Sequence, residues 1–218
     1  MRPDEGSPIA AKDGASEAGE IAALFQAIAQ DLKIISQSPY VTEICRATEL
    51  LASCFSTGGK LLVFGNGGSS ADAQHICGEL VGRFQCERKA LPAIALSANQ
   101  AILTAWSNDY SFDTVFSRQI EALGRAGDVA WGISTSGNSR NVIEALKVSR
   151  ELGLRTIGLT GKGGGRTAPW CDVLISVPLT ETARIQEVHV VTYHAICAGI
   201  ERRLVSAWTE SIPGSTDR

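Results

Sequence analysis

The sequence lacks three features that mark common classes of protein. It has no surplus of positive charge, because 20 Lys and Arg residues stand against 23 Asp and Glu residues, for a net charge of −3. This balance disfavours a general nucleic-acid binder. No apolar run approaches the roughly 18 residues that a membrane-spanning helix needs. The N-terminus has neither the basic start nor the apolar core of a secretory signal. We therefore expect a cytoplasmic protein that binds neither nucleic acid nor a membrane.

The chain also lacks a C-x-x-C pair. Its six cysteines are scattered along the sequence, at Cys45, Cys54, Cys77, Cys86, Cys171 and Cys197. Several of them fall in apolar helix or strand contexts. Free buried thiols are the simplest interpretation of this pattern. A structural zinc site made of thiolates is not indicated.

With 218 residues, of which 44% are hydrophobic, the chain suits one domain with a sizeable core. We expect a disordered leader over 1–18, a single domain over 19–207 and a flexible tail over 208–218. The domain begins with two helices. The first has an amphipathic pattern between Ile21 and Ile35, ended by Pro39. The second covers about 40–56.

After these helices the pattern changes to short, apolar, β-branched runs at 60–65, 91–96, 128–133, 155–160 and 171–177. Helix-like segments alternate with the runs, at 69–83, 99–107, 112–124, 138–152 and 182–205. Continuous apolar strands separated by helices indicate a parallel sheet covered on both faces. The sequence therefore predicts a doubly wound α/β fold with a five-stranded parallel sheet and an N-terminal helical extension.

Two of the loops that follow predicted strands are rich in hydroxyl groups. The 65–70 loop reads GNGGSS, and the 134–139 loop reads STSGNS. Each places backbone N–H groups and small side chains at a helix N-terminus, where an anion is favoured. Neither loop is a Walker A motif or a dinucleotide fingerprint. Helix capping explains the first loop equally well. It explains the second less well, because capping requires one hydroxyl and STSGNS offers four.

Two pairs of side chains could move protons or bind a metal. His75 and Glu79 are one helical turn apart, and Gln186 and His194 are a little over two turns apart on a long predicted helix. A surface His–Glu pair and a buried Gln and His with local hydrogen bonds are the alternatives. Spacing alone does not bring the two helices together.

The chain resembles a known family across residues 20–205. The similarity lies in three motifs, which read FGNGGSSADAQHICGEL (64–80), GISTSGNSRNVIEALKVSRELGLRTIGLTGKGGG (132–165) and TARIQEVHVVTYHAICAGIE (182–201). The second is similar to the core of a sugar isomerase (SIS) domain, a flavodoxin-like three-layer sandwich. Together the three resemble the phosphoheptose isomerases, which act on sedoheptulose 7-phosphate.

The resemblance implies site residues. Those that match the family's metal ligands, usually for one zinc ion, are His75, Glu79, Gln186 and His194. It carries the carbon base onto Glu79 and the opposing acid/base onto His194. The implied substrate contacts are Asn66, Gly67, Gly68, Ser69, Glu79, Asn108, Asp109, Ser134, Thr135, Ser136, Ser139 and Gln186. The glycines of the 161–165 loop are expected to form a flexible turn rather than a contact.

The activity implied is isomerisation of D-sedoheptulose 7-phosphate to D-glycero-D-manno-heptose 7-phosphate through a cis-enediol, in a homotetramer with shared active sites. Two other interpretations stay open. Related SIS proteins bind the bacterial replication initiator without turning over a sugar, but they typically replace the positions that match Glu79 and His194. Other SIS modules sense phosphosugars, usually beside a second domain. The metal, the anomer and the pathway (lipopolysaccharide, capsule or natural product) stay open at this point.

Overall fold

The computed structural model describes residues 16–210, and it confirms the five-stranded parallel sheet. The strands are β1 (Leu61–Gly65), β2 (Ala93–Ala95), β3 (Val129–Ser134), β4 (Arg155–Thr160) and β5 (Val173–Ser176). All neighbouring pairs are parallel, in the order β2-β1-β3-β4-β5. Every residue of β1 and β3 is buried, as expected of strands covered on both faces.

The strand order reverses between β1 and β3. This is the topological switch point of a flavodoxin-like sheet, where ligands bind beyond the carboxyl ends of the strands. The 65–70 loop follows β1 and the 134–139 loop follows β3. The two loops that the sequence singled out therefore lie side by side at the switch point.

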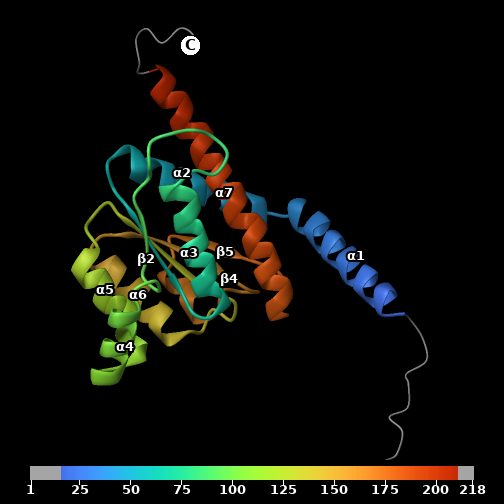
Figure 1. The fold of residues 1–218 in the computed structure, drawn as a ribbon, viewed down its shortest axis with the longest axis horizontal. Coiled ribbons are helices and arrows are strands. Elements are labelled where there is room, and N and C mark those ends of the chain that lie inside the picture. Colours follow the sequence, from blue (N-terminus) through green and yellow to red (C-terminus); the bar gives the residue numbers. More distant parts are fainter. Residues whose placement is uncertain (1–15, 211–218) are drawn as a thin grey trace, which may run out of the picture.

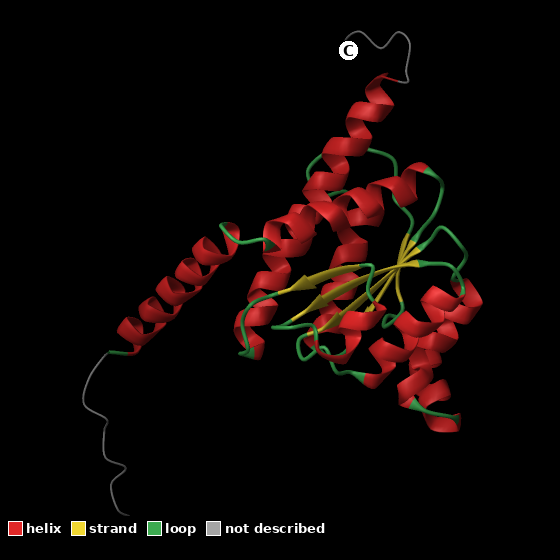
Figure 2. Ribbon diagram, turned by 180° about the vertical axis from the view of Figure 1, so that it is seen from behind, coloured by secondary structure: helices red, strands yellow, loops and turns green. Residues whose placement is uncertain are grey.

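Helices cover both faces of the sheet (Figures 1 and 2). On one face pack α2 (Tyr40–Ser56), α3 (Gly68–Val81) and α7 (Thr182–Glu210). On the other pack α4 (Gln100–Asp109), α5 (Val115–Leu123) and α6 (Arg140–Glu151). The largest fully buried side chain is that of Trp131 in β3, the middle strand. The three-layer architecture is the one expected.

Helix α1 (Glu17–Ser36) stands away from the body of the molecule (Figures 1 and 2). Its apolar stripe faces solvent: Phe25 is 68% exposed, Ile21 50% and Leu24 46%. The helix starts at Glu17, where Ser16 accepts from the backbone N–H of Gly19, so it begins before the end of the 1–18 leader that we expected. The rest of that leader, residues 1–15, lies outside the described residues.

The remaining differences are at element boundaries. The segment 112–124 is a short 3₁₀ turn, η1 (Phe112–Thr114), followed by α5, rather than one helix. Helix α7 continues to Glu210, three residues into the tail expected over 208–218; residues 211–218 lie outside the described residues. Among the described residues, no helix is long and apolar enough to cross a membrane.

Candidate active site

Helices α3 and α7 lie side by side and run in the same direction (Figure 1). Contacts occur at three levels in the same order along both. Gln186 lies against Gly68 at the start, His194 lies beside His75 in the middle, and Glu201 binds the loop after α3 at the end. The two distant segments that spacing alone could not connect are therefore neighbours.

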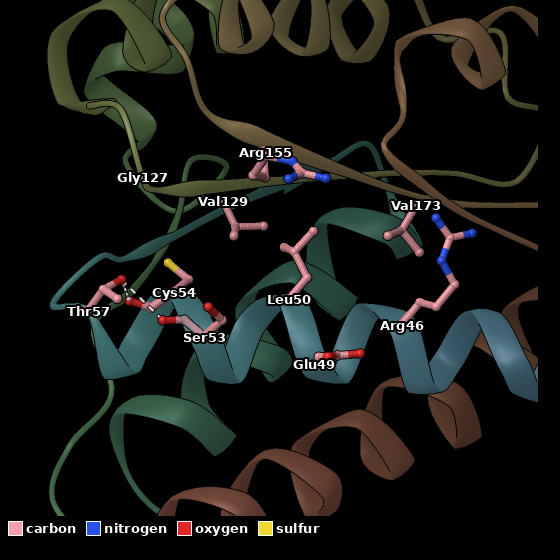
Figure 3. Close-up of a pocket in the computed structure, with 10 residues that line it drawn as sticks. All are labelled: Arg46, Glu49, Leu50, Ser53, Cys54, Thr57, Gly127, Val129, Arg155 and Val173. Carbon is pink, nitrogen blue, oxygen red and sulfur yellow. Dashed lines mark hydrogen bonds between the residues drawn. The ribbon is translucent and has the colours of Figure 1, made fainter.

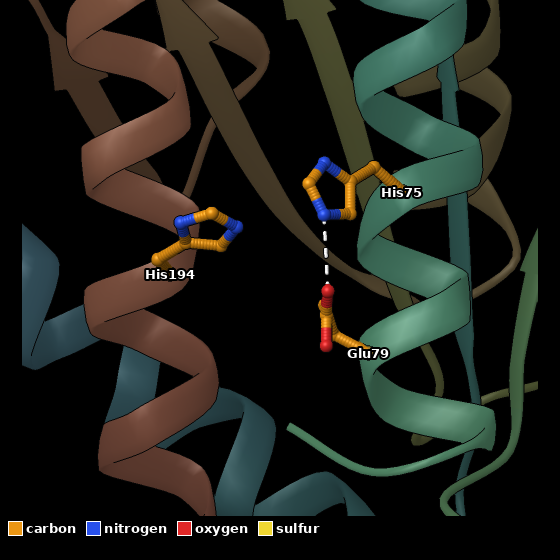
Figure 4. Close-up of side chains that lie close together, drawn as sticks. All are labelled: His75, Glu79 and His194. Carbon is orange, nitrogen blue, oxygen red and sulfur yellow. Dashed lines mark hydrogen bonds and ion pairs between the residues drawn. The ribbon is translucent and has the colours of Figure 1, made fainter. Parts of the chain in front are cut away.

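At the middle level, His75, Glu79 and His194 form a cluster (Figure 4). One ligand atom from each lies within 4.8 Å of the others. His75 Nε2 is 3.0 Å from Glu79 Oε1, which is the i, i+4 contact expected on one face of α3. His194 approaches from α7, with its ring centroid 5.1 Å from that of His75. The structure thus brings together three of the four predicted metal-binding side chains.

His194 has unused hydrogen-bonding capacity. Its ring stacks on Phe84, with centroids 5.2 Å apart, and its Nε2 is buried without a hydrogen-bond partner among the described residues. Burial, and secondarily the nearby His75, lower the pKa of His194. The imidazole is therefore neutral at pH 7, with a lone pair able to bind a metal or accept a proton.

The other side of the His75 ring is held by Tyr193. Tyr193 Oη lies 3.0 Å from His75 Nδ1, and it also approaches Asp72 at 3.5 Å. Burial raises the pKa of the Asp72 carboxyl, although the tyrosine hydroxyl opposes the shift. The sequence analysis missed Tyr193 and Asp72. A search for neighbours of His75 at helical spacing would have found Asp72, which lies on the same helix, but not Tyr193, which lies on α7.

The cluster fits a divalent metal such as zinc. It combines two imidazoles and a carboxylate, donors that suit zinc, with an orphaned buried nitrogen on His194. A second partner for a ligating histidine is typical of metal sites, and Tyr193 supplies one for His75. Gln186 contacts the 65–70 loop: a Cβ on Gly68 would collide with its amide nitrogen. The glycine at 68 makes that approach of Gln186 possible.

Hydrogen bonds connect the 65–70 loop to α6, the helix that follows β3. Asn66 and Asn141 exchange two side-chain amide hydrogen bonds of 2.9 Å each, across the switch point. Gly67 adopts φ +56°, a conformation that favours glycine, and Gly67 and Gly68 are exposed at the start of α3. Asn141 is 2% exposed, and it is a further residue that the sequence analysis missed.

The 134–139 loop offers hydroxyls that bind mainly to one another. Ser134 Oγ lies 3.0 Å from Ser139 Oγ and 3.5 Å from Ser136 Oγ. Ser139 is the N-cap residue of α6, but its side chain makes no capping hydrogen bond. Capping therefore does not account for its hydroxyl. Thr135 belongs to the same loop and is half-buried.

The 161–165 segment includes a turn, and its glycines pack closely against the 134–139 loop. A Cβ at Gly137 would collide with the carbonyl of Gly164, so the two loops pack backbone against backbone. Thr167 N donates to Gly137 O, and Arg166 N donates to Asn138 Oδ1. The glycine run thus permits a close approach that holds the 134–139 loop in place.

Asn108 and Asp109 end α4 on the surface. Asn108 Nδ2 donates to Asp109 Oδ1 at 2.8 Å, and both side chains are exposed. The structure gives neither a contact with the His75, Glu79 and His194 cluster.

Two cavities differ in position. One of about 420 Å³ lies between the starts of α3 and α7 and is lined by Gly68, Asp72 and Gln186 among others. Another of about 480 Å³ lies at the opposite end of the sheet, between α2 and the first residues of β3, β4 and β5 (Figure 3). Only the first lies at the carboxyl ends of the strands, beside the predicted site residues.

Comparison with known proteins points to one family. A family model described as the SIS domain matches residues 25–161. The phosphoheptose isomerase of Geotalea daltonii is 57% identical over 162 residues, covering 74% of this chain and 84% of its own. That of Crocosphaera subtropica is 55% identical over 164 residues, with 73% and 84% covered. The solved phosphoheptose isomerase of Neisseria gonorrhoeae superposes with a TM-score of 0.80 at 45% identity, over 86% of this chain and 100% of its own.

Proposed function

Because this chain is an isomerase that belongs to the phosphoheptose isomerase family, we propose that it converts D-sedoheptulose 7-phosphate to D-glycero-D-manno-heptose 7-phosphate. The observation that carries the proposal is the convergence of Glu79 from α3 and His194 from α7 (Figure 4). An aldose–ketose isomerase needs proton-transfer groups that face the same pair of carbon atoms. A phosphosugar-binding protein has no need of them.

In the proposed reaction Glu79 removes a proton from C1 of the ketose, which gives a cis-enediol. A proton then returns to C2, while His194 exchanges protons with the sugar oxygens. Burial lowers the pKa of His194 and so favours the neutral imidazole, the form that can accept a proton from a hydroxyl and return it. Negative charge develops on O1 and O2 in the intermediate.

His75, Glu79 and His194, with Gln186 reaching from the start of α7, would hold the metal. A bound zinc ion would supply positive charge that stabilises the developing negative charge. Glu79 and His194 are each assigned two roles in this scheme, metal ligand and proton-transfer group. The roles compete, because a side chain bound to a metal is a weaker base.

We assign the sugar phosphate to the two loops at the switch point. The Ser134, Ser136 and Ser139 hydroxyls, the neighbouring Thr135, and the N-terminus of α6 offer donors to the phosphate without a basic side chain. Asn66, Gly67, Gly68 and Ser69 at the start of α3, with Gln186 above them, would contact the sugar. The phosphate lies far from C1, so its binding energy serves to position the reacting end.

A homotetramer with shared active sites is part of the proposal. The exposed apolar stripe of α1 needs a partner, and a neighbouring copy would bury Phe25 and Leu24. Asn108 and Asp109, which contact none of the cluster within the chain, are assigned to substrate binding in that assembly. Light scattering coupled to size exclusion tests it: we expect four copies, and a stable monomer with full activity would contradict shared sites.

The reaction is tested by running it in deuterium oxide and following the sugar by NMR. The enediol route predicts deuterium at C2 of the aldose product and at C1 of recovered ketose. Glu79→Gln should abolish deuterium incorporation at both carbon atoms. Product formed without deuterium would contradict proton exchange through an enediol, and no product at all would favour a binding protein.

A further inference from the structure

We propose that the buried ion pair of Arg88 and Glu201 is a positioning element that sets the separation of Glu79 and His194. Neither residue reaches the reacting atoms, and the proposal rests on the function proposed above. The pair joins the end of α3 to α7 through the 82–88 loop. Both side chains are only 1% exposed.

Arg88 holds the last turn of α3. Its guanidinium donates to Glu79 O at 2.7 Å and to Leu80 O at 2.8 Å, with a weaker bond to Gly82 O at 3.4 Å. These carbonyls lack partners within the helix, and a cation at a helix C-terminus is favoured by the helix dipole. The backbone of Glu79 itself, whose side chain is the proposed base, is therefore fixed by Arg88.

Glu201 holds the loop to α7. Its carboxylate accepts from the backbone N–H groups of Phe84, Gln85 and Cys86 at 3.0, 2.8 and 3.0 Å, and from Arg88 Nε at 2.9 Å. Burial acts to raise the pKa of Glu201, but these donors outweigh it and lower the pKa overall. Glu201 is seven residues after His194, two turns along the same helix face.

The bonds form a continuous connection from one proposed catalytic residue to the other. It runs from the Glu79 carbonyl through Arg88 and Glu201 to α7, which carries His194. The same loop presses Phe84 against the His194 ring. Removing either partner would leave the other charge and several backbone groups buried without partners, so the pair also contributes to stability. Small displacements of reacting groups are costly to catalysis.

The chain offers a matched control in the residues that immediately precede β1 and β3. Asp128 also accepts two backbone N–H groups, those of Lys60 and Arg125, and pairs with Lys60 Nζ, but it contacts nothing in the cluster. Its side chain is 5% exposed. Asp128→Asn therefore measures the general effect of removing a buried carboxylate. Any further loss of zinc affinity or kcat in Glu201→Gln is the effect on the site.

The test is zinc affinity of the full chain by competition with a chromophoric chelator, with kcat and KM on sedoheptulose 7-phosphate. Glu201→Gln should weaken zinc binding about 10- to 100-fold, as losses around metal ligands do. It should lower kcat more than KM, and Asp128→Asn should leave both near wild type. Arg88→Lys, which keeps the charge but loses the forked donors, should give a smaller loss in the same direction.

Equal zinc affinity in Glu201→Gln and Asp128→Asn, with Arg88→Lys unchanged, would overturn the proposal. Should Glu201→Gln fail to fold, the comparison of zinc affinity between Arg88→Lys and Asp128→Asn decides. If the wild type binds zinc but does not turn over the ketose, the proposed substrate fails while the affinity comparison still decides the positioning role. A wild-type protein that binds no zinc overturns both.

Discussion

The polar groups at the strand starts and those around the proposed site differ in how fully they are hydrogen-bonded. At the strand starts, Asp128 is fully engaged by Lys60 and Arg125, and its chain neighbours Gly127 and Val129 line the cavity of Figure 3. At the strand ends, serine hydroxyls of the 134–139 loop bind one another. Further along α7, His194 Nε2 has no partner among the described residues. The fold thus satisfies the polar groups at Asp128 and leaves hydrogen-bonding capacity unused around the proposed site.

This difference separates structural from functional polar residues better than burial does. Asp128 and Asn141 are both buried and both hydrogen-bonded, but only Asn141 joins the two loops of the proposed site. The 480 Å³ cavity at the strand starts is as large as a ligand pocket, yet its two arginines, Arg46 and Arg155, are already paired with Glu43 and Asp172. Unused hydrogen-bonding capacity, at His194, is the feature that marks the site.

The largest effect should follow from removing the carbon base. Glu79→Gln should lower kcat by about 10³-fold, since a positioned general base contributes 10²–10⁴-fold. Turnover of sedoheptulose 7-phosphate by NMR measures it. Glu79 is only partly buried, so the melting temperature should change little. Undiminished turnover would remove Glu79 from the chemistry.

Asp128→Asn, at the strand starts and away from the cluster, should cost stability and spare activity. Breaking this ion pair should lower the free energy of unfolding by about 3 kcal/mol, the low end for buried pairs, because the Lys60 side chain is 23% exposed. Urea denaturation measures the loss, and kcat at 25 °C should stay within twofold. A large fall in kcat in the folded variant would contradict a purely structural role for Asp128.

The third histidine, His189, should make stability depend on pH without touching the reaction. Burial lowers its pKa to about 4, although the backbone carbonyl of Thr160 opposes the shift. The unfolded state therefore binds a proton below about pH 6.5 that the folded state refuses, so stability is present above that pH and is lost as the pH falls toward 4.

Between pH 7 and pH 5 this histidine should account for about 2 kcal/mol of the fall in the free energy of unfolding. Urea titrations at both pH values measure it. His189→Gln should flatten that part of the dependence, and an equally steep dependence in the variant would contradict the assignment.

The smallest effect should come from one hydroxyl of the phosphate-binding loop. Ser139→Ala removes a donor that α6 does not use for capping, so stability should be kept. KM for the sugar phosphate should rise about 10-fold, the value of one hydrogen bond to a charged group. Steady-state kinetics measures it, and Ser117→Ala, a buried serine on α5 outside both loops, is the control. Equal KM values would place the phosphate elsewhere.

Sequence patterns predicted the sheet and the His75–Glu79 pair because both depend on local signals. Apolar β-branched runs specify strands such as β3, and helical spacing puts His75 and Glu79 on one face. The meeting of α3 with α7 came from family resemblance, since periodicity does not say which helices pack together. Arg88 and Glu201 could not be found this way: 113 residues separate them, and an arginine in a polar loop is usually on the surface.

The glycines at 161–165 show a different limit. In sequence they are typical of a flexible turn, and only the fold brings Gly164 against Gly137. Close backbone approach between distant segments leaves no local pattern, because glycine serves both purposes equally well.

The most direct test of the account is NMR of sedoheptulose 7-phosphate with the metal-stripped protein before and after zinc is added. We predict an unchanged ketose spectrum at first, and signals of an aldoheptose 7-phosphate once zinc is present. Full conversion by the metal-stripped protein, or none after zinc is restored, would contradict the claim that His75, Glu79 and His194 form a metal-assisted isomerase site.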